Sequence, residues 1–394
     1  MSAIPRYRPF GGPALFSAGF RPFFLGGAIW AAIAVPLWLA LYRGALVLPT
    51  ALPPTVWHAH ELIYGYGGAI VAGFLLTAIP NWTGRMPLQG VPLIALFVTW
   101  CAGRIAVLLS GAVGPLAAAV VDLAFPAAFT LAVAREIVTG RNWHNLAVVL
   151  GLALIGVGNA LVHLEAVGAA QTADLGNRLG IAILLNLIAV IGGRIVPSFT
   201  GNWLRKTKPE APVPKPSDVV DKGALIVIAV GVLGWALVPD GALTPFGLTA
   251  AGLAAGIRLM RWRGLATLAE PLLFVLHVGY AWLAIGLLLF GANALYPLLL
   301  PSAGLHALTT GAIGTMTLAV MTRASLGHTG RELHAGAGSA AIYVLVTAAA
   351  ALRVLAPSLP VYSDEAMTAA GAAWAAAFLL FALLYGPLLL RPRA

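Results

Sequence analysis

The chain of 394 residues has little charge and almost no cysteine. Lys, Arg, Asp and Glu together make up 9% of the residues, whereas 60% are hydrophobic, which is not the composition of a water-soluble globular protein. The one cysteine, Cys101, excludes a disulfide framework and a cysteine-based zinc site. Because a membrane span needs about 20 mostly apolar residues, these deficits indicate a polytopic membrane protein without a separate soluble domain.

The apolar residues form about twelve stretches of span length, joined by short connections. The expected spans lie near residues 23–42, 57–80, 91–109, 115–134, 146–164, 175–199, 224–238, 243–259, 271–292, 304–321, 340–355 and 369–390. Their continuous, Leu- and Ala-rich character favours α-helices over barrel strands, which would alternate over about 10 residues. The sequence therefore predicts an all-α membrane protein of about twelve transmembrane helices.

Basic residues are shared unevenly among the connections. The odd-numbered connections contain Arg43, Arg178 and Arg353 as their only basic residues, while the termini and the even-numbered connections contain most of the others. Since Lys and Arg are retained on the cytoplasmic side during insertion, we expect both termini in the cytoplasm. The net charge of +10 then follows from topology, and nucleic-acid binding is discarded.

One connection, residues 205–222, combines Lys, Pro, Glu and Asp and is typical of a solvated cytoplasmic linker. It divides the single transmembrane domain into halves, 1–204 and 223–394.

A Thr-Gly pair recurs near the ends of the second, sixth and tenth spans, at Thr83, Thr200 and Thr329. His60 precedes Thr83 by 23 residues (83 − 60), and His306 precedes Thr329 by 23 residues (329 − 306). This spacing suggests a threefold pseudo-repeat of four helices. Simple helix termination by Pro and Gly is the alternative explanation.

Titratable residues are costly inside a bilayer, so each one in a span is a candidate for function. They are His58, His60 and Glu61 in the second span, His163 and Glu165 at the end of the fifth, His277 in the ninth and His306 in the tenth. With the expected topology, all but His277 fall in the outer part of the bundle, where they could form one cluster.

His58 and His60 are two positions apart, which turns them about 200° away from each other on a helix. They therefore serve different sites. His60 and His306 have matched depths, and two imidazoles from opposite sides suit the axial positions of haem iron. The candidates for a second metal, copper or a second haem, are His58 and His163 with support from Glu61 or Glu165.

Four other residues have open roles, and two of them, His277 and His328, are further candidates for metal binding. His277 lies nearer the cytoplasmic side, where it ligates separately, lines a proton route with His328, or simply bonds to a neighbouring helix. Arg104 and Asp122 have similar depths and predict a buried ion pair, with anchoring of a haem propionate by Arg104 as the alternative.

These patterns leave three classes of protein open. A haem or copper redox protein accounts for the outer histidine cluster. A secondary transporter accounts for twelve spans with a central linker and Gly-interrupted helices. A sensor or chaperone without turnover would share the sequence features of the redox protein.

Several longer motifs carry a resemblance. They are FRPFF at 20–24, HAHE at 58–61, GFLLTAIPNWTG at 73–84, Gly193-Arg194 with Pro197 and Phe199-Thr200, and MTRASLGHTGR at 321–331. In this order, over nearly the whole chain, they resemble the NnrS family. The resemblance implies a bacterial inner-membrane protein with haem b and copper, made in response to nitric oxide and associated with denitrification and resistance to nitrosative stress.

The four-helix repeat also resembles the catalytic subunits of haem-copper oxidases and their nitric oxide reductase relatives. By position, His60 and His306 would take the role of the low-spin haem ligands in those proteins. The relatives hold their second metal with histidines on spans 6 and 7, where this chain has none, so only the haem part carries over.

The resulting expectation is a membrane protein that binds or reduces nitric oxide at an outer metal cluster. It leans towards a nitric oxide reductase-like oxidoreductase with an unidentified electron donor. A secondary transporter of a small molecule, metal or haem is the alternative.

Overall fold

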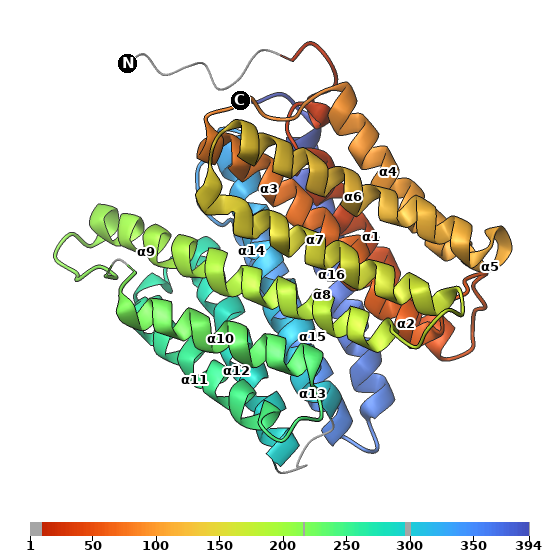
Figure 1. Ribbon diagram of the computed structural model, residues 1–394. Helices are drawn as coiled ribbons and strands as arrows, with labels where there is room; N and C mark the ends of the chain where they lie inside the picture. Colours follow the sequence, from red (N-terminus) through yellow and green to blue (C-terminus); the bar gives the residue numbers. More distant parts are fainter. Residues whose placement is uncertain (1–9, 216, 296–300, 394) are drawn as a thin grey trace. The chain divides into compact units, whose positions relative to one another are not determined.

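The computed structural model describes residues 10–215, 217–295 and 301–393, and their regular structure is helical throughout (Figure 1). Eleven helical segments in this part of the chain are long and apolar enough to cross a membrane. The predicted all-α membrane fold is therefore confirmed. Residues 1–9 and 394, which belong to the termini expected in the cytoplasm, and Pro216 of the expected linker lie outside the described residues.

The helices group into two compact units. The first takes the chain up to Gly180, Ala324–Arg331 and the segment from Ala382 onward. The second takes Ile181–Arg323 and Glu332–Phe381. The segment 205–222 lies inside the second unit, and the division into halves at this segment stays a prediction.

In the first unit, α6 packs between α4 and α7, and α3 packs against both α1 and α6. The elements that begin in this unit are η1 (Ala14–Phe16), α1 (Phe20–Tyr42), α2 (Pro54–His60), η2 (Glu61–Gly67), α3 (Gly68–Thr83), α4 (Val91–Leu108), α5 (Ser110–Val113), α6 (Pro115–Thr139), η3 (Trp143–Asn145), α7 (Leu146–Ala166) and α8 (Ala173–Leu187). The ends of α14 and α16 complete the unit.

In the second unit, α12 contacts α9, α11, α13 and α15. Its elements are the end of α8, η4 (Ile188–Gly192), α9 (Gly193–Thr207), α10 (Val219–Leu237), α11 (Thr244–Arg261), η5 (Gly264–Thr267), α12 (Pro271–Leu295), α13 (Pro301–His306), η6 (Ala307–Gly314), α14 (Thr315–His328), α15 (Ala337–Leu355), η7 (Ala356–Ser358) and α16 (Ser363–Leu390).

The helix boundaries follow local chemistry. Proline occupies a first-turn position in α2, α4, α6 and α11, where its missing N–H would have no helical partner in any case. Gly84 ends α3 in the left-handed conformation. Asp218 accepts a hydrogen bond from the backbone N–H of Asp221 at 3.1 Å, which caps α10.

Among residues 10–215, 217–295 and 301–393, π-helical segments occur in three spans. They are the second, sixth and tenth, the same spans that end near a Thr-Gly pair. η2 begins 22 residues before Thr83 (83 − 61), and η6 begins 22 residues before Thr329 (329 − 307). η4 begins 12 residues before Thr200 (200 − 188). In the second and tenth spans the π-helical segment begins directly after the histidine and at the same distance from the Thr-Gly pair. In the sixth span the π-helical segment lies closer to the Thr-Gly pair. π-Helical turns are frequent at functional sites.

The eighth expected span, 243–259, corresponds to α11, which carries Arg258 and Arg261 and is not among the eleven apolar candidates. Arg21, at the start of α1, donates hydrogen bonds to the carbonyls of Leu389 and Arg391 at the end of α16, at 2.8 and 2.6 Å. The two ends of the helical chain therefore lie at the same end of the first unit. Helix ends on the same side of a bilayer require an even number of crossings, so a twelfth crossing by α11 stays a prediction.

Arg258 explains how α11 tolerates charge, because every contact of its buried side chain is internal. Its Nε donates to Asp221 Oδ1 at 3.2 Å, and its Nη1 donates to the Ala189 carbonyl at 2.9 Å and the Tyr280 hydroxyl at 2.7 Å. The Ala189 carbonyl belongs to η4, where the π-helical turn disturbs ordinary pairing. A Cβ on Gly193 would lie 1.9 Å from Arg258 Nη2, so this approach requires glycine.

Replacement of Arg258 by Ala is expected to lower the free energy of unfolding by about 3–5 kcal/mol, because it leaves a buried carboxylate without its cation. Thermal or denaturant unfolding in detergent would measure the change. Arg261→Ala is the control, because Arg261 pairs mainly with the half-exposed Asp218 and lies 3.8 Å from Asp221, so its loss should cost much less stability. Equal losses in the two variants would contradict the structural role of Arg258.

A second polar contact fixes the loop after α14. Glu270, buried just before α12, accepts hydrogen bonds at Oε1 from the backbone N–H groups of Leu272 and Ala335, each at 3.1 Å. Its Oε2 lies 2.8 Å from Nδ1 of the exposed His334. The hydrogen bond and charge of Glu270 raise the pKa of the His334 imidazole.

Because the pKa of His334 is higher in the folded state, the protonated imidazole stabilises the fold, and this contribution is complete below the unfolded-state pKa of about 6.5. The contribution is lost as the pH rises through the folded-state pKa. The difference in Tm between the wild type and His334→Ala should therefore be largest near pH 6 and shrink towards pH 8. Thermal scans at several pH values would measure it. A difference that grows with pH would exclude the ion pair with Glu270.

Candidate metal centre

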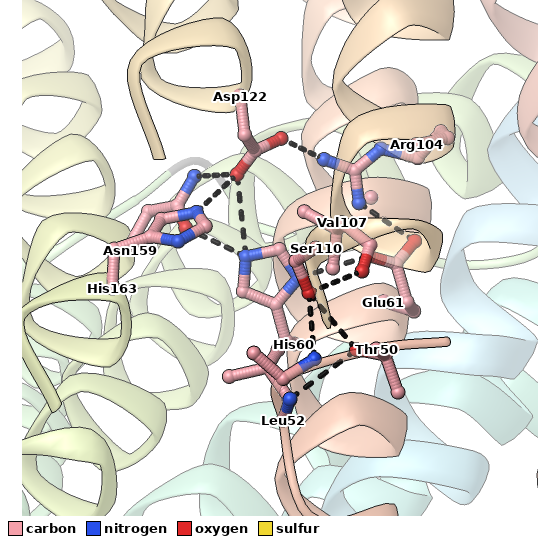
Figure 2. A network of polar contacts seen from close by, with 12 residues as sticks. Thr50, Leu52, His60, Glu61, Arg104, Val107, Ser110, Asp122, Asn159 and His163 are labelled. Carbon is pink, nitrogen blue, oxygen red and sulfur yellow. Dashed lines mark hydrogen bonds and ion pairs between the residues drawn. The ribbon is translucent and has the colours of Figure 1, made fainter. Parts of the chain in front are cut away.

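Six polar side chains from four consecutive spans converge inside the first unit (Figure 2). Those of His60 and Glu61 come from the junction of α2 and η2, and Arg104 comes from α4. Asp122 comes from α6, and Asn159 and His163, four residues apart on one face of α7, complete the set. All six residues are at most 4% exposed, so the cluster is shielded from solvent.

Arg104 joins the two carboxylates of the cluster. Its Nη1 donates to Glu61 Oε2 at 2.7 Å, and its Nη2 donates to Asp122 Oδ1. The predicted ion pair between Arg104 and Asp122 is thus present, with Glu61 as a second partner. Arg104 Nε is buried and has no hydrogen-bond partner among the described residues.

Both nitrogens of His60 face oxygen atoms. Nδ1 lies 2.9 Å from Glu61 Oε1, whereas Nε2 lies 2.8 Å from Asn159 Oδ1 and 3.2 Å from Asp122 Oδ2. A carboxylate on the far nitrogen is the arrangement that orients metal-binding histidines in proteins.

Asp122 Oδ2 is the meeting point of the cluster. It accepts a hydrogen bond from Asn159 Nδ2 at 2.8 Å and lies 2.9 Å from His163 Nε2. The ligand atoms of His60, Asp122 and His163 all lie within 4.8 Å of one another, close enough to hold one metal ion. The rings of His60 and His163 are edge to face, with centroids 5.2 Å apart.

The formal charges favour a cation here. Two carboxylates and one guanidinium leave one negative charge in an apolar interior, and an uncompensated charge there is costly. Without metal, a proton on each nitrogen of His60 satisfies both its hydrogen bonds and this charge. A metal ion at Nε2 would take over the same neutralising role.

The cluster fits a single metal ion, because two imidazoles and a carboxylate are a donor set used by iron, copper and zinc. A porphyrin on His60 stays a prediction and would require the contacts of this ring to change. Both ring nitrogens are engaged, the ring has 0% exposure, and the adjoining cavity is far too small for a porphyrin.

Two other predicted ligands of the first unit lie elsewhere. The ring of His58 stacks on Trp38, with centroids 4.2 Å apart, on the side of the helix away from His60. His328 packs against Phe20 with centroids 5.4 Å apart. Glu165, considered as support for a metal, accepts a hydrogen bond from the backbone N–H of Ala173 at 2.8 Å and so caps α8.

His277 and His306 belong to the second unit. The Thr200 hydroxyl donates to the Val196 carbonyl at 2.8 Å, so His277 Nε2, 2.9 Å away, donates to Thr200. His277 is therefore bonded to a neighbouring helix. His306 Nδ1 donates to the Ser302 carbonyl at 2.7 Å, which leaves Nε2 as the basic nitrogen, the usual state of a ligand histidine. The pairing of His60 with His306 stays a prediction.

Sequence reasoning missed Asn159 and assigned Asp122 only to Arg104. Asn159 is uncharged and therefore escaped a search for ionisable residues. Its position four residues before His163 was the available signal, because this spacing places two polar side chains on one face of an apolar helix.

Glycine at position 65 is needed for the site. A Cβ there would lie 2.5 Å from Arg104 Nη1 and 3.0 Å from Glu61 Oε2, whereas a Cβ on Gly68 would lie 3.7 Å from Phe125, an ordinary contact. Gly65→Ala should lower the free energy of unfolding by about 1–3 kcal/mol through overpacking, and Gly68→Ala should be tolerated. Unfolding of both variants in detergent tests this, and equal tolerance would show that Arg104 is loosely held.

The NnrS family model, described as NnrS protein, matches residues 14–393. No curated protein matches the chain. The match extends over all the described helices and agrees with the resemblance that the motifs carry. The chain therefore belongs to the NnrS family, whose members are membrane proteins tied to the response to nitric oxide.

Proposed function

We propose that this protein binds nitric oxide at a metal ion held by His60, Asp122 and His163. The observation that carries the proposal is the convergence of these three ligands in a buried site. The family supplies the connection to nitric oxide. A copper or iron ion bound by three protein groups has an open coordination position for a diatomic ligand and can exchange an electron.

The remaining residues would position the ligands. Glu61 fixes the ring of His60 through Nδ1, so that Nε2 points at the site. Arg104 donates a hydrogen bond to both Glu61 and Asp122 and so keeps each carboxylate in its present rotamer. Asn159 bridges His60 and Asp122 in the metal-free cluster, and its amide would turn aside or offer Oδ1 when an ion binds.

The apolar surroundings set the chemistry of this centre. Phe125 and Phe129 of α6 are buried beside the cluster and keep water at a minimum. A dry site favours an uncharged diatomic ligand over anions, which would lose their hydration without replacement. Both termini in the cytoplasm, an inner-membrane location and haem b on His306 remain parts of the proposal that the sequence motivates.

His163→Ala is expected to lose the bound metal, because it removes one of the three ligands without touching Arg104. Protein purified after loading with copper or iron would be compared with the wild type by elemental analysis, and nitric oxide binding would be followed by electron paramagnetic resonance. His144→Ala, in the exposed connection before α7, is the matched control. Full metal content in His163→Ala would overturn the site.

Glu61→Gln is a milder companion, since it keeps the shape of the side chain and removes the charge that orients His60. Loss of such a supporting carboxylate typically weakens metal affinity about 10–100-fold. If the wild-type protein retains its metal but gives no nitric oxide signal, the cluster transports or stores the ion, as in the rival class of transporters.

A further inference from the structure

A cavity adjoins the metal centre between α3, α6 and α7 of the first unit. It is large enough for a water-sized molecule and has two chemically different ends. Arg104, Asp122 and Asn159 line the inner end, which places the cavity directly against the candidate metal site. The side chain of Arg104 also carries a buried Nε without a hydrogen-bond partner among the described residues.

The outer part of the cavity is apolar. Phe129 of α6 and Leu152 and Ile155 of α7 are buried and form its walls. A water molecule needs two to four polar partners, which these side chains do not offer. This part of the cavity is therefore suited to an apolar guest.

The rim of the cavity faces the lipid side of the bundle. Val71, Pro126 and Thr130 at the rim are only half-buried. The neighbouring Leu131 of α6 and Leu150 of α7 are 71% and 62% exposed, as expected for side chains in contact with lipid tails.

The helix α6 contains a proline beside the cavity. Pro126 lacks the N–H that would bond to the carbonyl of Asp122, so α6 loses one helical hydrogen bond beside the cavity. The backbone break and the metal-ligand side chain therefore occur in the same turn, and the cavity extends from that turn to the rim.

We infer that this cavity admits small apolar diatomic gases from the bilayer to the metal centre. The inference rests on the proposed function for the identity of the gas, nitric oxide, but the apolar cavity can be tested without metal. An uncharged diatomic molecule partitions into hydrocarbon and reaches the rim without crossing a layer of ordered water. The apolar walls keep charged solutes out, because they offer such solutes no replacement for their hydration.

Xenon is the probe, because it binds apolar protein cavities and needs no metal. Xenon binding to metal-free protein in detergent would be measured by xenon nuclear magnetic resonance for the wild type, Thr130→Trp and Leu131→Trp. Thr130→Trp fills the rim, whereas Leu131→Trp adds the same bulk to the adjacent lipid-facing position. We expect loss of xenon binding in the first variant and retention in the second. Gly68→Leu blocks from α3 and serves if Thr130→Trp does not fold.

The same variants, loaded with metal, would be mixed rapidly with nitric oxide. Slower association in Thr130→Trp, with Leu131→Trp unchanged, would support passage through the rim. Xenon binding that is equal in all folded variants would overturn the cavity assignment. If xenon binds as expected but nitric oxide associates equally fast with all variants, the entry route is overturned. If xenon binds as expected but no variant binds nitric oxide, the proposed function is overturned and the gas cavity remains.

Discussion

The buried guanidinium of Arg104 is the interaction on which the first unit depends. It faces two carboxylates, Glu61 on the second span and Asp122 on the fourth, and through Asp122 it sets the position of two histidines. A charge in an apolar interior is tolerated only when its hydrogen-bond geometry is good. The helices α4 and α6 and the π-helical turn η2 are thus held in register by one side chain.

The second unit uses the same solution with different residues. Arg258 and Asp221 form a buried pair beside η4, and Gly193 provides the space that Gly65 provides beside η2. In both units a cation lies against a π-helical or adjoining turn where glycine allows close approach. This similarity agrees with a repeat of structure along the chain, although the order of Arg and Asp on the helices is reversed.

Much of the fold could be predicted because hydrocarbon imposes simple rules. Continuous apolar stretches predicted the helices, and the expected spans 91–109 and 115–134 begin where α4 and α6 begin. The site was predicted only in part. Sequence indicates the depth of Asp122 but not the rotation of α6 against α7, which decides that Asp122 also faces His60 and His163. The π-helical turn at Glu61 likewise changes which neighbours share a face, and spacing alone does not reveal it.

Arg21 makes the first unit depend on contacts between residues far apart in the sequence. It lies at the start of α1, while the two carbonyls that it binds lie at the end of α16, 368 and 370 positions away. Contacts of such separation form late in folding, because a long loop must close before they are made. A chain cut before Leu388 would leave this buried cation without its carbonyl partners, and the first unit would lose one of its closing contacts.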